Sequence, residues 1–102
     1  MKHLILMVHG NVQQELADRL HSLKQVQGFT FTHVEGRGTH VAHDPFQSAR
    51  DQVVGYVPRI QVEVLLEDGD VATVLATLRG EDNSLTGQGI YWVTPVEQHG
   101  RL

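Results

Sequence analysis

Histidine is the residue type in this sequence that is best suited to metal chemistry. Seven histidines occur among 102 residues, and imidazole suits zinc, nickel, copper and cobalt. His40 and His43 stand beside Asp44 in an H-x-x-H-D cluster, and His99 is the nearest further ligand. Because two histidines in an irregular segment fix no geometry, solvated loop histidines are the alternative interpretation. The pattern gives a hypothetical metal site at His40, His43 and His99.

Two glycine-bearing turns have the residue types that receive an anion. Gly36-Arg37-Gly38-Thr39 follows one extended segment, and Thr86-Gly87-Gln88-Gly89 precedes another. Glycine lets backbone N–H groups converge on an anion, and arginine can bind phosphate or carboxylate in a bidentate manner. Neither turn is a Walker A or a complete dinucleotide fingerprint. Ordinary turns at strand ends are therefore the simpler interpretation of both.

The sequence contains no pattern that is typical of nucleophilic catalysis. Neither Ser48 nor Ser84 lies in a G-x-S-x-G elbow. The paired carboxylates, Glu67-Asp68 and Glu81-Asp82, fall in expected turns. The chain has no cysteine, which excludes a cysteine nucleophile, a thiolate zinc site and a disulfide scaffold. We therefore expect a protein that is not an enzyme.

Length and charge limit the class of protein further. A chain of 102 residues predicts a single domain, residues 1–102. Its net charge of −4 includes no basic stripe, which argues against a nucleic-acid partner. No apolar run approaches the ~20 residues that a bilayer requires, so we expect no direct membrane insertion. The first ten residues lack the features of a signal peptide, and we expect a cytoplasmic protein.

The first half of the chain predicts a strand, a helix and a second strand. Residues 4–8 form a short apolar run that is typical of a buried strand. A helix is expected from Val12, with Asn11 as its N-cap and Gly28 as its left-handed stop. Aromatic and β-branched residues alternate over 29–35, which indicates a second strand.

The second half of the chain repeats this plan after a long connection. Residues 39–57 have no sustained apolar periodicity and predict a long loop. A strand over 58–66, a helix over 71–78, a polar loop over 81–89 and a strand over 90–94 follow. The order β-α-β-β-α-β predicts an α+β domain of the ferredoxin-like class, whose helices cover one face of the sheet.

The uncovered face of such a sheet is expected to be apolar. It would carry either Phe29 and Phe31 or the threonines Thr30 and Thr32, depending on the register of the second strand. An apolar open face on a small domain predicts oligomerisation. Tyr91 and Trp92 must point to opposite faces of their strand, so one should enter the core and the other should meet an interface or the open face, with the core as the default for both. His33, between apolar neighbours, is expected to be a hydrogen-bonded structural residue.

Three stretches of the chain resemble the PII-like signalling proteins. The segment 53–65, VVGYVPRIQVEVL, is similar to that family's passage from its long T-loop into the third strand. The segment 28–38, GFTFTHVEGRG, resembles its second strand and T-loop base. The segment 87–96, GQGIYWVTPV, resembles its B-loop exit and fourth strand. The resemblance covers essentially the whole chain.

This resemblance implies a ferredoxin-like subunit of a homotrimer, with effector clefts between the subunits. The T-loop would span about residues 39–57 and contact a target protein, and the B-loop would span about 80–89. The family is mostly non-enzymatic: it senses small molecules, often adenine nucleotides, and regulates transporters or enzymes. Carried onto this chain, the effector contacts are Gly36, Arg37, Gly38, Thr39, His40, Arg59, Gly87, Gln88, Gly89 and Arg101.

Several of these positions differ from the family pattern. Thr39 and His40 stand where the family has an arginine followed by a glutamine. Ile90 follows Gly89 directly, in the place of the family's B-loop lysine. The paired C-terminal arginines of the family reduce to Arg101, whereas Arg59 keeps the place of a basic residue that contacts an acidic ligand.

The chain further resembles a divergent PII-like branch. That branch is encoded beside heavy-metal efflux pumps of the resistance-nodulation-division type. A short T-loop, the strand G-I-Y-W-V-x-P-V and the ending Gly100-Arg101-Leu102 are the shared features. This likeness implies control of a membrane efflux transporter and metal-responsive roles for His40 and His43. The alternative is a histidine-based protein that binds divalent transition metals, as in the cation-tolerance proteins of the same trimeric fold.

Overall fold

Four antiparallel strands form the sheet of this protein. The computed structural model describes residues 1–37, 56–80 and 85–102. In these ranges the strands follow the spatial order β2-β3-β1-β4, so β1 and β3 are central and β2 and β4 are edge strands. Their bounds are β1 (Lys2–His9), β2 (Thr30–Gly36), β3 (Val57–Leu66) and β4 (Gly89–Pro95).

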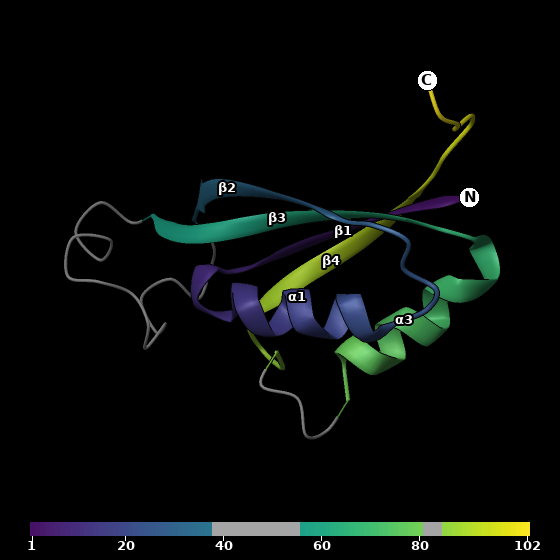
Figure 1. Ribbon diagram of the computed structural model, residues 1–102. Coiled ribbons are helices and arrows are strands. Elements are labelled where there is room, and N and C mark those ends of the chain that lie inside the picture. Colours follow the sequence, from purple (N-terminus) through teal and green to yellow (C-terminus); the bar gives the residue numbers. More distant parts are fainter. Residues whose placement is uncertain (38–55, 81–84) are drawn as a thin grey trace.

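Two helices connect the strands in the predicted order. Each helix follows a short 3-10 turn: α1 (Gln13–Ser22) follows η1 (Gly10–Val12), and α3 (Val71–Leu78) follows η3 (Asp68–Asp70). Figure 1 shows both helices on the same face of the sheet. The β-α-β-β-α-β order and this single helix layer confirm the predicted ferredoxin-like α+β fold. None of the helices in the described ranges has the length and apolar character needed to cross a bilayer.

The hydrophobic core lies between the helix layer and the two central strands. Alternate residues of each central strand point toward the helices, as a period of two requires. On β1 these are Leu4, Leu6 and Val8, which pair with Val64, Val62 and Ile60 of β3. The helices contribute buried Leu16, Leu20, Val74 and Leu78. The apolar periodicity of the sequence therefore identifies both sides of the core.

The register of β2 determines which of its residues face the open side of the sheet. Phe31 pairs with Val62, a core residue, and so faces the helices. Thr30 pairs with Glu63 and Thr32 with Gln61, and these threonines lie on the open face. Of the two registers that the sequence allowed, the structure therefore has the one that exposes the threonines.

The predicted cap and stop of the first helix are both wrong. Asn11 does not cap the helix with its side chain; instead its backbone N–H donates to Nδ1 of His9 across 3.3 Å. The helix ends at Ser22, because Leu23 adopts an extended backbone with ψ of 120°. Gly28 comes several residues later, and among the described glycines only Gly87 has a positive φ. A change to extended backbone, rather than a left-handed glycine, ends α1.

The default expectation of the core for both Tyr91 and Trp92 is wrong, whereas the expectation that one of them meets the open face is confirmed. They do point to opposite faces: Tyr91 pairs with Leu6 on the helix side, and Trp92 pairs with Ile5 on the open side. Both side chains nevertheless remain about 40% exposed, at 41% and 40%. The physical reason is that β4 is an edge strand, so neither side chain is enclosed by neighbouring strands on both sides.

The position of the core predicts that substitutions of two leucines differ clearly in their effect on the stability of the protein. Leu20 is fully buried under the sheet, whereas Leu102 is fully exposed. We expect Leu20→Ala to lower the free energy of unfolding by about 2–5 kcal/mol, because it leaves a cavity in close-packed surroundings. Leu102→Ala should change it by less than about 0.5 kcal/mol. Urea denaturation at one fixed protein concentration measures both, and equal effects of the two variants would contradict this core.

Candidate functional site

The sheet register brings several of the predicted effector contacts to one end of the molecule. Gly36, the last residue of β2, pairs with Val57 at the start of β3. On the other side, the end of β1 meets the start of β4, where Val8 pairs with Gly89. Arg59 pairs with both His9 and Val34. We call this end of the sheet, which carries Gly36, Arg37, Arg59 and the turn 87–89, the loop end.

Arg59 lies directly over Gly36 at the loop end. A Cβ atom added to Gly36 would come within 2.5 Å of Cδ and 2.7 Å of Nε of Arg59. Glycine at position 36 therefore gives the arginine side chain room to lie across the end of β2. Within the described residues Arg59 has no ion pair with a carboxylate. Together with exposed Arg37, it places positive charge at the loop end.

The turn 87–89 is held against the end of β1 by its own backbone. Gly87 has a φ of 76°, in the left-handed region that glycine occupies without strain. The Gln88 N–H donates to the Leu85 carbonyl across 3.0 Å, and the Gln88 carbonyl accepts from the His9 N–H across 2.9 Å. A Cβ on Gly89 would lie only 2.8 Å from Val8 Cα. Both glycines are therefore required by the turn itself.

His9 is a buried residue of the loop end to which sequence analysis assigns no role. Its side chain is only 6% exposed, and its Nδ1 accepts the Asn11 N–H at the start of η1. It pairs with Arg59 across the sheet. A signal was present in the sequence, since the residue stands between an apolar strand and a Gly-Asn turn. His9 thus connects the end of β1 to the helix and faces the candidate site.

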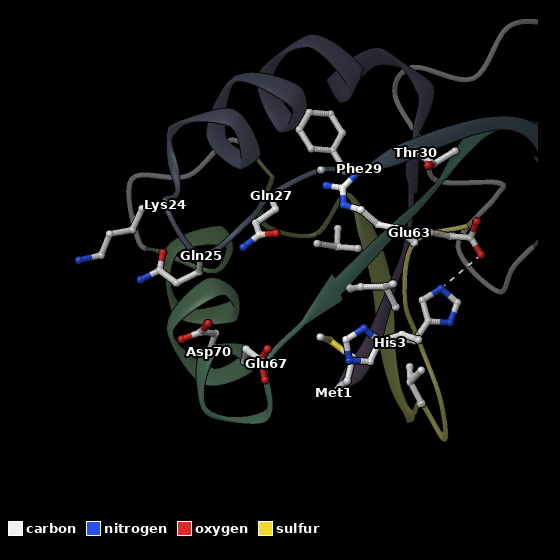
Figure 2. Close-up of a pocket in the computed structure, with 16 residues that line it drawn as sticks. Met1, His3, Lys24, Gln25, Gln27, Phe29, Thr30, Glu63, Glu67 and Asp70 are labelled. Carbon is white, nitrogen blue, oxygen red and sulfur yellow. Dashed lines mark ion pairs between the residues drawn. The ribbon is translucent and has the colours of Figure 1, made fainter.

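A charged groove lies at the opposite end of the sheet. It has a volume of about 970 Å³ and is bounded by the N-terminus, the chain after α1, the end of β3 and the C-terminal tail. Figure 2 shows His3 beside Glu63, and their Nε2 and Oε1 atoms are 3.3 Å apart. His99 and Arg101 also line this groove. We call it the tail groove.

Groups of both charge signs surround the tail groove. Lys24 and Arg101 contribute positive charge, and Glu67 and Asp70 contribute negative charge. Next to it, the Met1 amino group contacts Asp68 across 2.6 Å and holds the pKa of that carboxyl below its usual range. Such a groove suits a ligand, or a protein surface, that carries both charge signs.

The predicted effector contacts therefore fall into two sets within one chain. Gly36, Arg37, Arg59 and the turn 87–89 lie at the loop end, whereas Arg101 lies in the tail groove. The length of β1 separates the two ends, roughly 23 Å at ~3.3 Å per residue. Figure 1 shows both chain termini at the end away from the loop end. Gly38 and Thr39 lie outside the described residues.

The predicted metal ligands are not brought together by the described part of the chain. His99 lines the tail groove, and His40 and His43 lie outside the described ranges. Residues 1–37, 56–80 and 85–102 contain no cluster of three or more potential ligands that could hold a metal ion. The metal site stays a prediction. The hydrogen bond expected for His33 is present, because its Nε2 lies 3.3 Å from Oε1 of Gln13 on α1, with both side chains at the surface.

A ferredoxin-like sheet with one open face, and with glycine turns and arginines at its loop end, defines a PII-like protein. Comparisons with known proteins agree. The whole chain, residues 1–102, matches the family described as "Protein of unknown function (DUF3240)". The chain therefore belongs to the DUF3240 family.

Curated relatives of this chain include nitrogen regulatory proteins P-II, and a solved structure of a DUF3240 protein shares its fold. The nitrogen regulatory protein P-II of Azospirillum brasilense is 26% identical over 103 residues, which cover 100% of this chain and 91% of the relative. That of Cereibacter sphaeroides is 33% identical over 78 residues, covering 76% and 70%. The crystal structure of a DUF3240 family protein from Shewanella baltica OS155 superposes with a TM-score of 0.77, at 20% identity and covering 99% and 94%. The predicted PII-like family and fold are confirmed.

The contacts of Gly89 predict that it tolerates no side chain. In Gly89→Ala the new methyl group would collide with backbone atoms of Met7 and Val8, which cannot move without opening the β1–β4 pairing. We expect a loss of about 1–3 kcal/mol in the free energy of unfolding. Gly28→Ala is the matched control, because open space surrounds that position. Chemical denaturation of both variants tests this; a Gly89→Ala protein as stable as Gly28→Ala would refute the close approach.

Proposed function

We propose that this protein is a regulatory signal-transduction protein that binds a small effector between copies of the chain and conveys its presence to a target protein. Its P-II relatives, which carry the name of nitrogen regulatory proteins, support the regulatory class. The proposal includes a homotrimer, no enzymatic activity and a cytoplasmic location. The observation that carries it is the division of the effector contacts between the two ends of the sheet.

The separation of Arg59 from Arg101 explains why more than one copy is needed. One chain cannot place both arginines on the same small molecule, because the length of β1 lies between them. In a closed ring of identical subunits, the same two unlike surfaces meet at every interface. Such a ring sets the loop end of one copy against the tail groove of the next. Each cleft then holds Arg37 and Arg59 from one subunit and Arg101 from its neighbour.

The open face of the sheet supplies a reason for the copies to associate. Leu65, Ile90 and Trp92 all lie on this face and are 50%, 66% and 40% exposed. Ile5 and Met7 lie between them on β1. Burying a large apolar side chain contributes about 1.5–3 kcal/mol. Three copies that place these faces around a common axis would therefore gain substantial free energy of association.

The charges at the proposed cleft favour an anionic effector. Arg37, Arg59 and Arg101 would surround it, and we propose an adenine nucleotide as its class. Ile90, which stands in the place of the family's B-loop lysine, adds an apolar contact instead of a charge. Gly38, Thr39 and His40 complete the proposed contacts from the base of the T-loop. A divalent transition metal bound through His40, His43 and His99 is the competing effector.

The connection between β2 and β3 is the proposed contact with the target. Both strands that carry it end at the loop end, beside Gly36 and Arg59. An effector held by these residues would therefore contact the base of residues 39–57 and bias their arrangement through differential contacts. We propose a membrane efflux transporter, in the heavy-metal class, as the target.

Mixing two inactive variants tests whether each cleft uses two subunits. Arg59→Ala and Arg101→Ala should each weaken nucleotide binding by about tenfold or more, because each removes a charged contact. Randomly mixed subunits of the two variants should regain about a quarter of the intact clefts, since one cleft takes one contact from each neighbour. Calorimetric titration with ATP, ADP, AMP and cyclic AMP measures the number of restored sites.

The control for this experiment is Arg19→Ala. Arg19 lies on α1, and its Nη2 is 3.0 Å from Oε1 of Glu15. Its substitution should leave nucleotide binding unchanged. Mixtures that regain no site would contradict a cleft built from two subunits. A wild-type protein that binds none of the four nucleotides would contradict the nucleotide, and saturable binding of zinc, nickel, copper or cobalt in its place would favour the histidine-based alternative.

A further inference from the structure

A second hollow lies on the helix side of the sheet, away from Arg59. It is formed between the C-terminal end of α3 and the start of β4, and its volume is about 500 Å³. Its walls include Leu78, Arg79, Leu85 and Tyr91. Tyr91 pairs with Leu6 and so faces the helix layer, whereas Arg59 lies on the open face. The hollow is therefore separate from the proposed arginine contacts of the effector cleft.

Arg79 brings a positive charge to this hollow. Its guanidinium carbon lies 5.8 Å from the centre of the Tyr91 ring, and its Nη1 donates to the Tyr91 hydroxyl across 3.4 Å. A guanidinium has five N–H donors, and this contact uses one of them. In the described part of the chain no carboxylate forms an ion pair with Arg79, whereas Arg19 is paired with Glu15. An anion on Arg79 would therefore displace no ion pair to a residue in the described ranges.

Apolar side chains form the rest of the hollow. Leu78 is almost fully buried beneath it, and Leu85 packs against the core. Tyr91, on this side of the sheet, remains 41% exposed. Large apolar groups left in water gain free energy when a ligand covers them. A guanidinium held beside an aromatic ring also offers a flat surface for stacking. These walls favour a ligand with a flat apolar body.

The adjacent turn has one backbone N–H that is not available to an anion in this hollow. Phosphate sites at glycine turns depend on several backbone N–H groups that point at the ligand. In this turn the Gln88 N–H is already donated to the Leu85 carbonyl. The positive charge comes from one guanidinium, whose geometry matches the two oxygens of a carboxylate.

We propose that this hollow binds an aromatic carboxylate. The carboxylate would lie on the Arg79 guanidinium, and the ring would pack against Tyr91 and Leu85. The proposal does not depend on the effector cleft or on the trimer, because the residues named here come from one subunit. It adds a second ligand site that shares only the turn 87–89 with the first.

Three matched probes test the proposal by amide NMR of the full ¹⁵N-labelled chain. Benzoate carries ring and charge, benzamide the ring alone and acetate the charge alone. We expect benzoate to shift the amide signals of residues 79 and 85–91 saturably, and the other two probes to bind at least about tenfold more weakly. Arg79→Gln should weaken benzoate binding about tenfold, and the control Arg19→Gln should leave it unchanged.

Several results would overturn the proposal. Benzoate that leaves the signals of residues 79 and 85–91 in place would remove the site. If benzamide binds as tightly as benzoate, the charge does not contribute to binding. If acetate binds as tightly as benzoate, the ring does not contribute. Unchanged benzoate affinity in Arg79→Gln would show that Arg79 does not hold the carboxylate. If Arg79→Gln fails to fold, the comparison of the three probes on the wild-type protein still decides the question.

Discussion

The structure depends on the fact that two helices cover only one face of a four-stranded sheet. The core residues of β1 and β3 alternate with residues that point the other way, so every buried position has an open-face neighbour. On β1 and β4 these neighbours include Ile5, Met7, Ile90 and Trp92. Ile5 is buried within one chain, whereas Ile90 and Trp92 stay 66% and 40% exposed and form an apolar surface that the described part of one chain leaves open. The proposed assembly of three copies follows from this constraint.

The antiparallel topology also decides where chemistry can occur. The loop end of the sheet holds the ends of β1 and β2 and the starts of β3 and β4. Both chain termini lie at the opposite end. As a result Arg59 and the turn 87–89 are positioned by rigid strand ends, and Arg101 is carried by the C-terminal tail. In the proposed trimer, one subunit would present two different half-sites. Assembly and ligand binding would then be linked, because a cleft between subunits gains affinity only when both halves meet.

Much of this fold follows from the sequence, because strand and helix periodicities are local. The alternation in 58–66 and the apolar run in 4–8 both give the observed central strands within one or two residues. The face of the sheet on which Phe31 lies and the exposure of Trp92 cannot be predicted from such local periodicity. They depend on register and on which strand is at the edge, and both are set by pairing between distant segments. The helix boundaries at Asn11 and Gly28 were mispredicted, because cap preferences are weaker than the packing that sets the chain path.

The candidate site shows the same division between local and long-range information. Gly36 and the turn 87–89 were identified from their motifs, and the structure explains each glycine by a close approach or a left-handed φ. The position of Arg101 at the far end of the sheet could not be predicted from its place in the chain. Arg79 and Tyr91 are twelve residues apart in sequence. No short motif identifies such a pair, and only the packing of α3 beside β4 brings them together.

The molar mass of the purified protein in solution tests the central claim, that the open sheet face is covered by further copies of this chain. Light scattering at micromolar concentration measures it directly. The account predicts a mass close to three times the 11.4 kDa of one chain. A mass of one chain would contradict it, since Leu65, Ile90 and Trp92 would then remain in water and no cleft between subunits would exist.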